Sequence, residues 1–394
     1  MAEKALMSSG TRRLVLWISA PVVAFVLVGG LLGQTLPRDT TYQQLKIFED
    51  VVRLISTNYV DTADMDRVMG GAMIGLADSL DPDSAYLSAD EVKRIESGAP
   101  LPAGDVGLDL TRQYYLRVVA ARDGSPAARA GLRTGDYVRA IGDRPTRYMS
   151  AFEGMRALRG VPGSTISLTV FRGNAIDPRV IELTREVPPA AEVTSRMAAT
   201  DIGYVRVAAV SARTASQVAA EVANLRKQGA ATLIVDVRRT SGGVLAGGLD
   251  MARLFVTGGA LAVRESQGAG RETIDAGPGA GAIALPTLLL VDTGTSGAAE
   301  VFASALAGNG RAELVGEQTL GRTAEQRLIR LPDGSGLWLT TARYLTPAGE
   351  PLHEKGLQPT VAVDQPLVDF GQTPPTADPV LDAAIERLAL RKAA

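Results

Sequence analysis

Hydrophobic and polar positions change their rhythm several times along the chain, and each rhythm predicts a different kind of element. Over residues 40–95 apolar side chains recur every three or four positions, which is the period of amphipathic helices. Over residues 116–170 short alternating runs are separated by glycine and proline turns, which is typical of a small β-rich module. From Ile202 onward, apolar strands such as residues 233–237 and 288–291 alternate with helical patterns. That alternation predicts a mixed α/β core whose central strands are mainly parallel.

An uncharged apolar run over residues 14–32 follows Lys4, Arg12 and Arg13 near the start of the chain. About 20 apolar residues span a bilayer, and a basic flank stays on the cytoplasmic side. We therefore expect residues 1–13 to be a cytoplasmic tail and residues 14–33 to be a single-pass inner-membrane anchor. The bulk of the chain is then periplasmic or otherwise extracytoplasmic. A cleaved signal peptide is the alternative, although its apolar core is ordinarily shorter.

Glycine- and proline-containing joints divide the rest of the chain. The expected parts are an N-terminal helical segment over residues 40–100, the β-rich module over 104–187, the α/β core over 188–366 and a C-terminal helix over 375–394. The Gly- and Ala-rich stretch over residues 267–284 is expected to be a loop. Asp378 and Pro379 suit the N-cap and the first turn of the last helix. The fold class is thus multidomain α/β, with separate helical, β and α/β parts.

Composition removes several classes of function. The 394 residues include 41 basic and 43 acidic side chains, which gives no electrostatic case for binding nucleic acid. There is no cysteine and a single histidine, so disulfides, thiolate nucleophiles and Cys- or His-rich metal clusters are excluded. We therefore expect neither a metal nor a cofactor.

Six motifs occur in one order along the chain: LDPDSAYL, GSPAARAGLRTGDYV, DVRRTSGG, LVDTGTSGAAE, LVGEQTLGRTAEQ and LTTARYLTPAGEPLHEKGLQPT. In this order they resemble the carboxy-terminal processing peptidases, also called tail-specific proteases. The resemblance extends from about Leu45 to Asp364. It implies a PDZ domain over the β-rich module, a core of the crotonase-like type, and serine-type endopeptidase chemistry on substrates captured by their C-termini.

The family uses a Ser-Lys dyad with a glutamine beside the lysine, and this chain departs from that pattern at both dyad positions. Anchoring on Glu300 puts the nucleophile position at Gly297. Anchoring on Gly321 puts the base position at Arg322, with Gln326 as the dyad-supporting residue. Glycine offers no nucleophile, and a guanidinium with a pKa above about 12 does not act as a base. The resemblance therefore implies a pseudoprotease whose catalytic dyad is lost.

Some of the surrounding frame is expected to remain. The backbone N–H groups of Gly243 and Ala298 are the expected oxyanion-type donors. Ser296 and Ser241 are the fallback nucleophiles, because one adjoins the nucleophile position and the other lies on the loop that faces the same cleft. Against them, a shift of one residue on a turn re-aims a side chain by roughly 100°. Serines at such turns commonly serve as caps.

The PDZ-like stretch gives the binding hypothesis. Its peptide-binding residues are expected to be Val106, Gly107, Leu108, Asp109 and Leu110, whose loop would hold a peptide carboxylate and whose strand would pair with the peptide. The expected partners are unstructured protein C-termini or a partner protease, for which the chain acts as scaffold or regulator. Two alternatives stay open. One is an active endopeptidase that uses Ser296 or Ser241, and the other is a structural subunit that self-associates through its N-terminal helices.

Overall fold

The computed structural model describes residues 40–173, 177–188, 192–365 and 377–393, and it falls into two units, Met1–Ala72 and Met73–Ala394. The described part of the first unit holds helix α2 (Thr40–Asn58) and the start of helix α3 (Met65–Asp78). Leu45 and Tyr59 of this unit are exposed, as an amphipathic face without a partner would be. No helix within the described ranges is long and apolar enough to cross a bilayer. The expected anchor at residues 14–33 lies outside these ranges.

In the second unit, the end of helix α3 is followed by a tight turn before strand β1 (Ala85–Leu87). Asp81 Oδ1 accepts the backbone N–H groups of Asp83 and Ser84, which closes the turn predicted by Asp-Pro-Asp-Ser. Strand β1 then pairs antiparallel with strand β16 (Gly336–Leu345). Helix α4 (Ala89–Glu96) follows, capped by Ser88. The turn thereby fixes the position of the buried Asp83.

The β-rich module is one sheet with two short helices. Its elements are β2 (Leu108–Gln113), β3 (Tyr115–Ala121), α5 (Pro126–Arg129), β4 (Tyr137–Ile141), β5 (Arg144–Pro145), the 3-10 turn Thr146–Tyr148, α6 (Ala151–Leu158), β6 (Thr165–Phe171) and β7 (Arg179–Thr184). The strand order is β2-β3-β4-β6-β7, with β5 beside β4. Alternate residues of β2 and β3 face a separate apolar core. Strand β2 forms one edge of this sheet.

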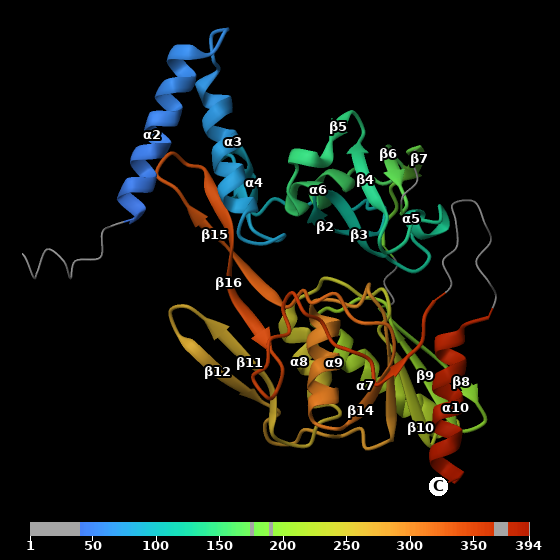
Figure 1. The fold of residues 1–394 in the computed structure, drawn as a ribbon. Coiled ribbons are helices and arrows are strands. Elements are labelled where there is room, and N and C mark those ends of the chain that lie inside the picture. Colours follow the sequence, from blue (N-terminus) through green and yellow to red (C-terminus); the bar gives the residue numbers. More distant parts are fainter. Residues whose placement is uncertain (1–39, 174–176, 189–191, 366–376, 394) are drawn as a thin grey trace, which may run out of the picture. The chain divides into compact units, whose positions relative to one another are not determined.

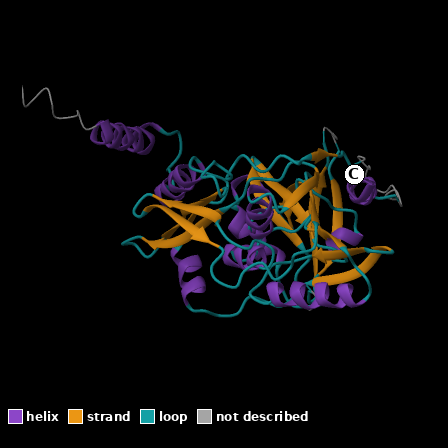
Figure 2. Ribbon diagram, turned by 90° about the horizontal axis from the view of Figure 1, so that it is seen from below, coloured by secondary structure: helices purple, strands orange, loops and turns teal. Residues whose placement is uncertain are grey.

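The α/β core is built on a six-stranded sheet. Its strands, in sheet order, are β17 (Val361–Ala362), β14 (Ala312–Gly316), β13 (Thr287–Val291), β10 (Thr232–Asp236), β9 (Ile202–Val207) and β8 (Val193–Ala199). All neighbouring pairs are parallel except β8 with β9, which confirms the prediction of mainly parallel central strands. Both faces are covered. Helices α7 (Thr214–Lys227), α8 (Leu245–Arg253) and α9 (Ala298–Gly308) bury one face, and α10 (Pro379–Ala393) packs on the other (Figure 1). Figure 2 shows this C-terminal helix beside the strands.

A second sheet extends the core, and here one sequence expectation was wrong. Strands β11 (Ala260–Ser266), β12 (Gly270–Asp275), β15 (Ala324–Arg330) and β16 join β1 in a five-stranded sheet. Residues 267–284 were expected to be a loop, yet they contain β12, which pairs antiparallel with β11. All but one of the β12 residues are exposed. Since no face of this strand is buried, its sequence carries no hydrophobic alternation by which it could be found.

Candidate functional site

The nucleophile position lies in the turn between strand β13 and helix α9. Gly297 is the N-cap of α9 and has φ 62° and ψ −127°, a backbone conformation that side-chain-bearing residues rarely adopt. The residue is buried, and a Cβ placed on it would lie 3.1 Å from the carbonyl oxygen of Gly242. Glycine is therefore the relaxed residue at this position, and it presents no side chain to a substrate.

The base position lies directly beside the nucleophile position. The N–H of Gly297 donates to the backbone carbonyl of Arg322 at 3.0 Å, so the two positions deduced from separate sequence anchors are neighbours in space. The segments that carry them are joined through the backbone. The backbones of the two expected dyad positions are thus hydrogen-bonded to each other, and the residues there are glycine and arginine.

Glu300 holds the turn that carries Arg322. Its carboxylate accepts the N–H of Gly321 at 2.7 Å and the N–H of Arg322 at 2.8 Å, and it also accepts the hydroxyl of Thr319. Complete burial on α9 raises the pKa of Glu300 to about 7, against the opposing effect of these three hydrogen bonds. In the sequence, Glu300 was used only to locate the nucleophile position. The structure gives it the role of fixing the position of the base-position backbone.

The guanidinium of Arg322 is already engaged by an ion pair and by a hydrogen bond. One Nη lies 2.5 Å from Oδ1 of Asp83, a carboxylate that is almost completely buried. The other donates to the backbone carbonyl of Leu110 on strand β2 at 3.2 Å. Asp83 belongs to a motif that the sequence showed, but its partner lies more than two hundred positions away along the chain. A local sequence pattern cannot predict a contact between residues so far apart in the chain.

The two hydroxyls next to Gly297 point into the protein. Ser296 is completely buried, and its hydroxyl has no hydrogen-bond partner among the described residues. Thr295 is also completely buried, and its hydroxyl donates to the carbonyl of Val237 at 2.9 Å. A nucleophile has to reach a substrate in the cleft. Neither hydroxyl has access to solvent in this conformation.

Ser241 is the accessible hydroxyl of the site. It is partly exposed, and its Oγ donates to Oδ2 of Asp109 on strand β2 at 2.5 Å. Burial raises the pKa of the Asp109 carboxyl, and the hydrogen bond from Ser241 opposes that rise. The structure thus pairs Ser241 with an acid from a different domain. The sequence named both residues but assigned them to separate roles.

The loop after Ser241 is packed against a neighbouring backbone. Gly243 has φ 77°, and a Cβ on it would lie 2.4 Å from the carbonyl oxygen of Val210, so only glycine fits there. This loop lies against the α9 turn, since Gly242 is the nearest neighbour of the Gly297 Cβ position. The roles of Gly243 and Ala298 as oxyanion-type donors stay predictions.

The expected dyad-supporting residue lies on strand β15, and the single histidine and Lys355 lie in a later turn. Gln326 on β15 donates from Nε2 to the Thr340 hydroxyl on β16 at 3.2 Å. Nδ1 of His353 accepts the backbone N–H of Thr323 at 3.3 Å. The single histidine is thus bonded to the backbone just after the base position. Lys355 is exposed, and its backbone carbonyl accepts the side chain of Gln318. The Gln326 amide is held by the neighbouring strand.

The expected peptide-binding loop is fixed by buried side chains and by a hydrogen bond within the loop. Val106, Leu108 and Leu110 are buried in the core of the β-rich module. Gly107 has φ 79°, and its N–H donates to Oδ1 of Asp105 at 3.1 Å. One of the backbone N–H groups expected to hold a peptide carboxylate is therefore already bonded to an internal carboxylate. The peptide-binding role of these residues stays a prediction.

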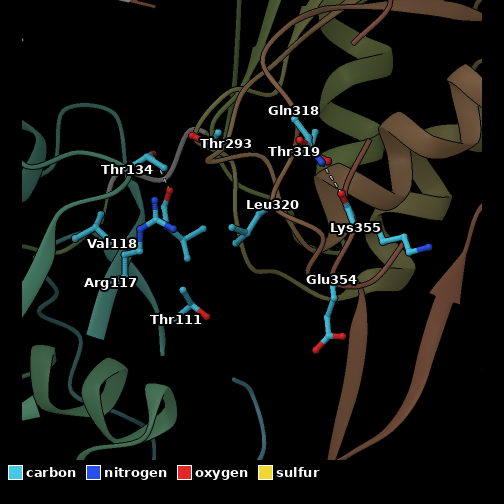
Figure 3. Close-up of a pocket in the computed structure, with 11 residues that line it drawn as sticks. Thr111, Arg117, Val118, Thr134, Thr293, Gln318, Thr319, Leu320, Glu354 and Lys355 are labelled. Carbon is cyan, nitrogen blue, oxygen red and sulfur yellow. Dashed lines mark hydrogen bonds between the residues drawn. The ribbon is translucent and has the colours of Figure 1, made fainter. Parts of the chain in front are cut away.

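A cleft of about 250 Å³ lies next to the site (Figure 3). One wall comes from Thr111, Arg117 and Val119 of strands β2 and β3. The opposite wall includes Thr293 and Leu320, which closely precede the nucleophile and base positions in the chain. No cluster of three or more acidic or histidine side chains that could hold a metal ion occurs in the described ranges.

Comparison with known proteins identifies the family. A family model described as peptidase family S41 matches residues 201–363, and one described as a PDZ domain matches residues 117–172. The carboxyl-terminal-processing protease of Picosynechococcus sp. is 31% identical over 332 residues, which are 81% of this chain and 78% of that protein. The carboxyl-terminal-processing protease of Synechocystis sp. is 34% identical over 69% of this chain, and the match spans 65% of that relative's length.

A solved structure agrees with the sequence relatives. The photosystem II D1 C-terminal processing protease superimposes with a TM-score of 0.67 and 27% identity, over 80% of this chain and 92% of that one. The β-rich module is accordingly a PDZ domain, and the α/β core is a peptidase S41 core. On the strength of these matches, the chain belongs to the carboxyl-terminal-processing protease family.

Proposed function

We propose that this protein is a non-catalytic member of its family that binds unstructured protein C-termini or a partner protease and acts as a scaffold or regulator. One observation carries the proposal: glycine and arginine occupy the adjoining nucleophile and base positions. Acyl transfer by a dyad needs a hydroxyl that attacks and a neutral amine that takes its proton. Gly297 has no hydroxyl, and a guanidinium such as that of Arg322 is not a neutral amine.

The engagement of Arg322 supports the same conclusion. A general base needs a free lone pair directed at the nucleophile. The Arg322 guanidinium instead donates to Leu110 and pairs with Asp83. Its place in the site is therefore that of an ion-paired donor.

The binding side of the proposal is supported by the PDZ domain. Strand β2 lies at the edge of its sheet, and an edge strand can accept an extended peptide as an additional strand. The names of the relatives refer to the processing of C-termini. We assign the recognition of C-termini to this chain, without the cleavage step.

The cellular placement is part of the proposal. The apolar run over residues 14–32 and its basic flank support a single-pass inner-membrane anchor with the PDZ domain and core in the periplasm. A scaffold held in that way meets its partners at the membrane surface.

A second candidate function has one specific observation in its favour. Ser241 Oγ lies 2.5 Å from the Asp109 carboxylate, and this distance suits proton transfer from a hydroxyl to a base. An active C-terminal processing endopeptidase that uses Ser241 as nucleophile and Asp109 as base is therefore the alternative. The buried Ser296 hydroxyl gives the other fallback nucleophile no comparable support.

Two measurements on the full chain test the proposal. The first records binding of unstructured peptides that end in a free carboxylate, with the C-terminal amides as controls. The second records cleavage of the same peptides by the unaltered chain and by Ser241→Ala, Ser296→Ala and Asp109→Asn variants. We expect binding without cleavage. Cleavage that one alanine variant abolishes would refute the non-catalytic assignment, and absence of binding to any free C-terminus would favour a purely structural, self-associating subunit.

A further inference from the structure

The edge of strand β2 has polar backbone groups that need partners. Leu110 pairs with Val118 of strand β3, but its own N–H and C=O both bond outside the sheet. The N–H donates to the thioether sulfur of Met155 on helix α6 at 3.3 Å, and the C=O accepts the guanidinium of Arg322 at 3.2 Å. These are the two groups that an added peptide strand would use for pairing.

The two partners of Leu110 come from different parts of the chain. Met155 belongs to the PDZ domain itself, and a thioether is a weak acceptor that a peptide can readily replace. Arg322 belongs to the peptidase core, and a charged donor makes a stronger hydrogen bond. The hydrogen bond from Arg322, at the expected base position, is therefore the stronger of the two contacts that a pairing peptide has to replace.

Arg322 is held at this edge from several directions. Its backbone N–H is fixed by Glu300, and its backbone C=O is fixed by Gly297. Its guanidinium is fixed by Asp83, whose carboxylate is almost completely buried and whose own position is set by the turn at Asp81. The contact with Leu110 is thus part of a preorganised arrangement.

The guanidinium presents two nitrogens of its planar fork to two different groups. One nitrogen of the guanidinium forms an ion pair with the Asp83 carboxylate. The other donates a hydrogen bond to the backbone carbonyl of Leu110. A lysine presents a single compact ammonium on a flexible stem and lacks this rigid fork. Arginine in place of lysine at position 322 therefore removes a general base and adds a contact that holds strand β2.

From these contacts, and resting on the proposed binding of peptides, we infer that Arg322 is a removable cap on the peptide-pairing edge of the PDZ domain. An extended polypeptide that adds to strand β2 displaces the guanidinium from the carbonyl of Leu110 and donates its own backbone N–H there. Asp83 retains the released guanidinium. Because linkage is reciprocal, a bound peptide also weakens this contact between the PDZ edge and the peptidase core.

The test compares peptide affinity in full-length variants. The probe is a fluorescein-labelled Gly-Ser-rich peptide that ends in Val-Ala-Leu with a free carboxylate, and anisotropy reports its dissociation constant. Arg322→Ala should bind the probe about tenfold more tightly than the unaltered chain, since the peptide no longer displaces a charged donor. Asp83→Asn, which loosens the guanidinium but leaves it in place, should tighten binding by a smaller factor. Arg327→Ala, at an exposed arginine of strand β15, is the matched control and should leave affinity unchanged.

The outcomes separate the cap from the proposed function. If the unaltered chain binds the probe and Arg322→Ala binds within twofold of it, the cap is refuted while the binding function stands. If neither binds, the proposed function fails and the cap fails with it. If Arg322→Ala unfolds, as judged by circular dichroism, Asp83→Asn decides, and an unchanged affinity in that variant refutes the cap.

Discussion

Replacing Glu300 by glutamine should change how the stability of the chain depends on pH. Glu300 is completely buried, and burial raises the pKa of its carboxyl from 4.5 to about 7. Between these two pH values the folded chain keeps a proton on Glu300 that the unfolded chain has released. The stabilisation associated with that proton is fully present below pH 4.5 and is lost as the pH rises through about 7.

The magnitude follows from the displacement of the pKa. One pH unit corresponds to about 1.4 kcal/mol, so ionised Glu300 costs the folded state about 3 kcal/mol relative to the protonated form. Glutamine resembles the protonated carboxyl in shape and does not titrate. The stability of Glu300→Gln relative to the unaltered chain should therefore rise by about 3 kcal/mol between pH 4.5 and pH 8, whatever constant penalty the amide brings.

The assay is urea unfolding of both proteins at several pH values, followed by tryptophan fluorescence. The control is Glu350→Gln, at an exposed glutamate in a turn, which should follow the unaltered chain at every pH. A difference between Glu300→Gln and the unaltered chain that stays constant over this range would contradict a raised pKa of Glu300. The base-position turn would then be held by a carboxylate that ionises without penalty.

Two other substitutions test the local geometry. Gly297→Ser should destabilise the chain by about 1–3 kcal/mol, because a side chain at φ 62° is strained and its Cβ would press on Gly242, and thermal unfolding should show a lower midpoint. Arg238→Met should cost about 3–5 kcal/mol in urea unfolding, because Arg238 pairs with the buried Asp236 at 2.6 Å and with Asp378 at the start of α10 at 2.7 Å. A midpoint for Gly297→Ser equal to that of the unaltered chain, or a loss below about 1 kcal/mol for Arg238→Met, would contradict these two accounts.

The sequence predicted the elements whose patterns are strong. The apolar strands at residues 233–237 and 288–291 were found because they are buried on both faces, and parallel pairing followed from their alternation with helices. Anchoring on Glu300 and Gly321 selected Gly297 and Arg322, whose backbones are joined by a hydrogen bond, and their assignment as dyad positions stays a prediction. Strand β12 was missed because it is exposed and carries no apolar periodicity.

Contacts between distant parts of the chain lay beyond sequence reasoning. The pairing of Arg322 with Asp83, and its hydrogen bond to Leu110, depend on how the PDZ domain and the linking turn are placed against the core. The pairing of Ser241 with Asp109 has the same origin. The sequence shows that each of these side chains is polar. Which partner each one bonds to is decided by the tertiary structure.

We propose that this chain performs no peptide hydrolysis. Its most direct measurement is mass spectrometry of an unstructured peptide with a free C-terminus, incubated for hours with a molar excess of the full chain in water enriched in oxygen-18. We predict intact peptide and no fragment that carries the heavy isotope at a new C-terminus. Labelled fragments formed by the unaltered chain, and absent with Ser241→Ala or Asp109→Asn, would show that the chain is an active peptidase.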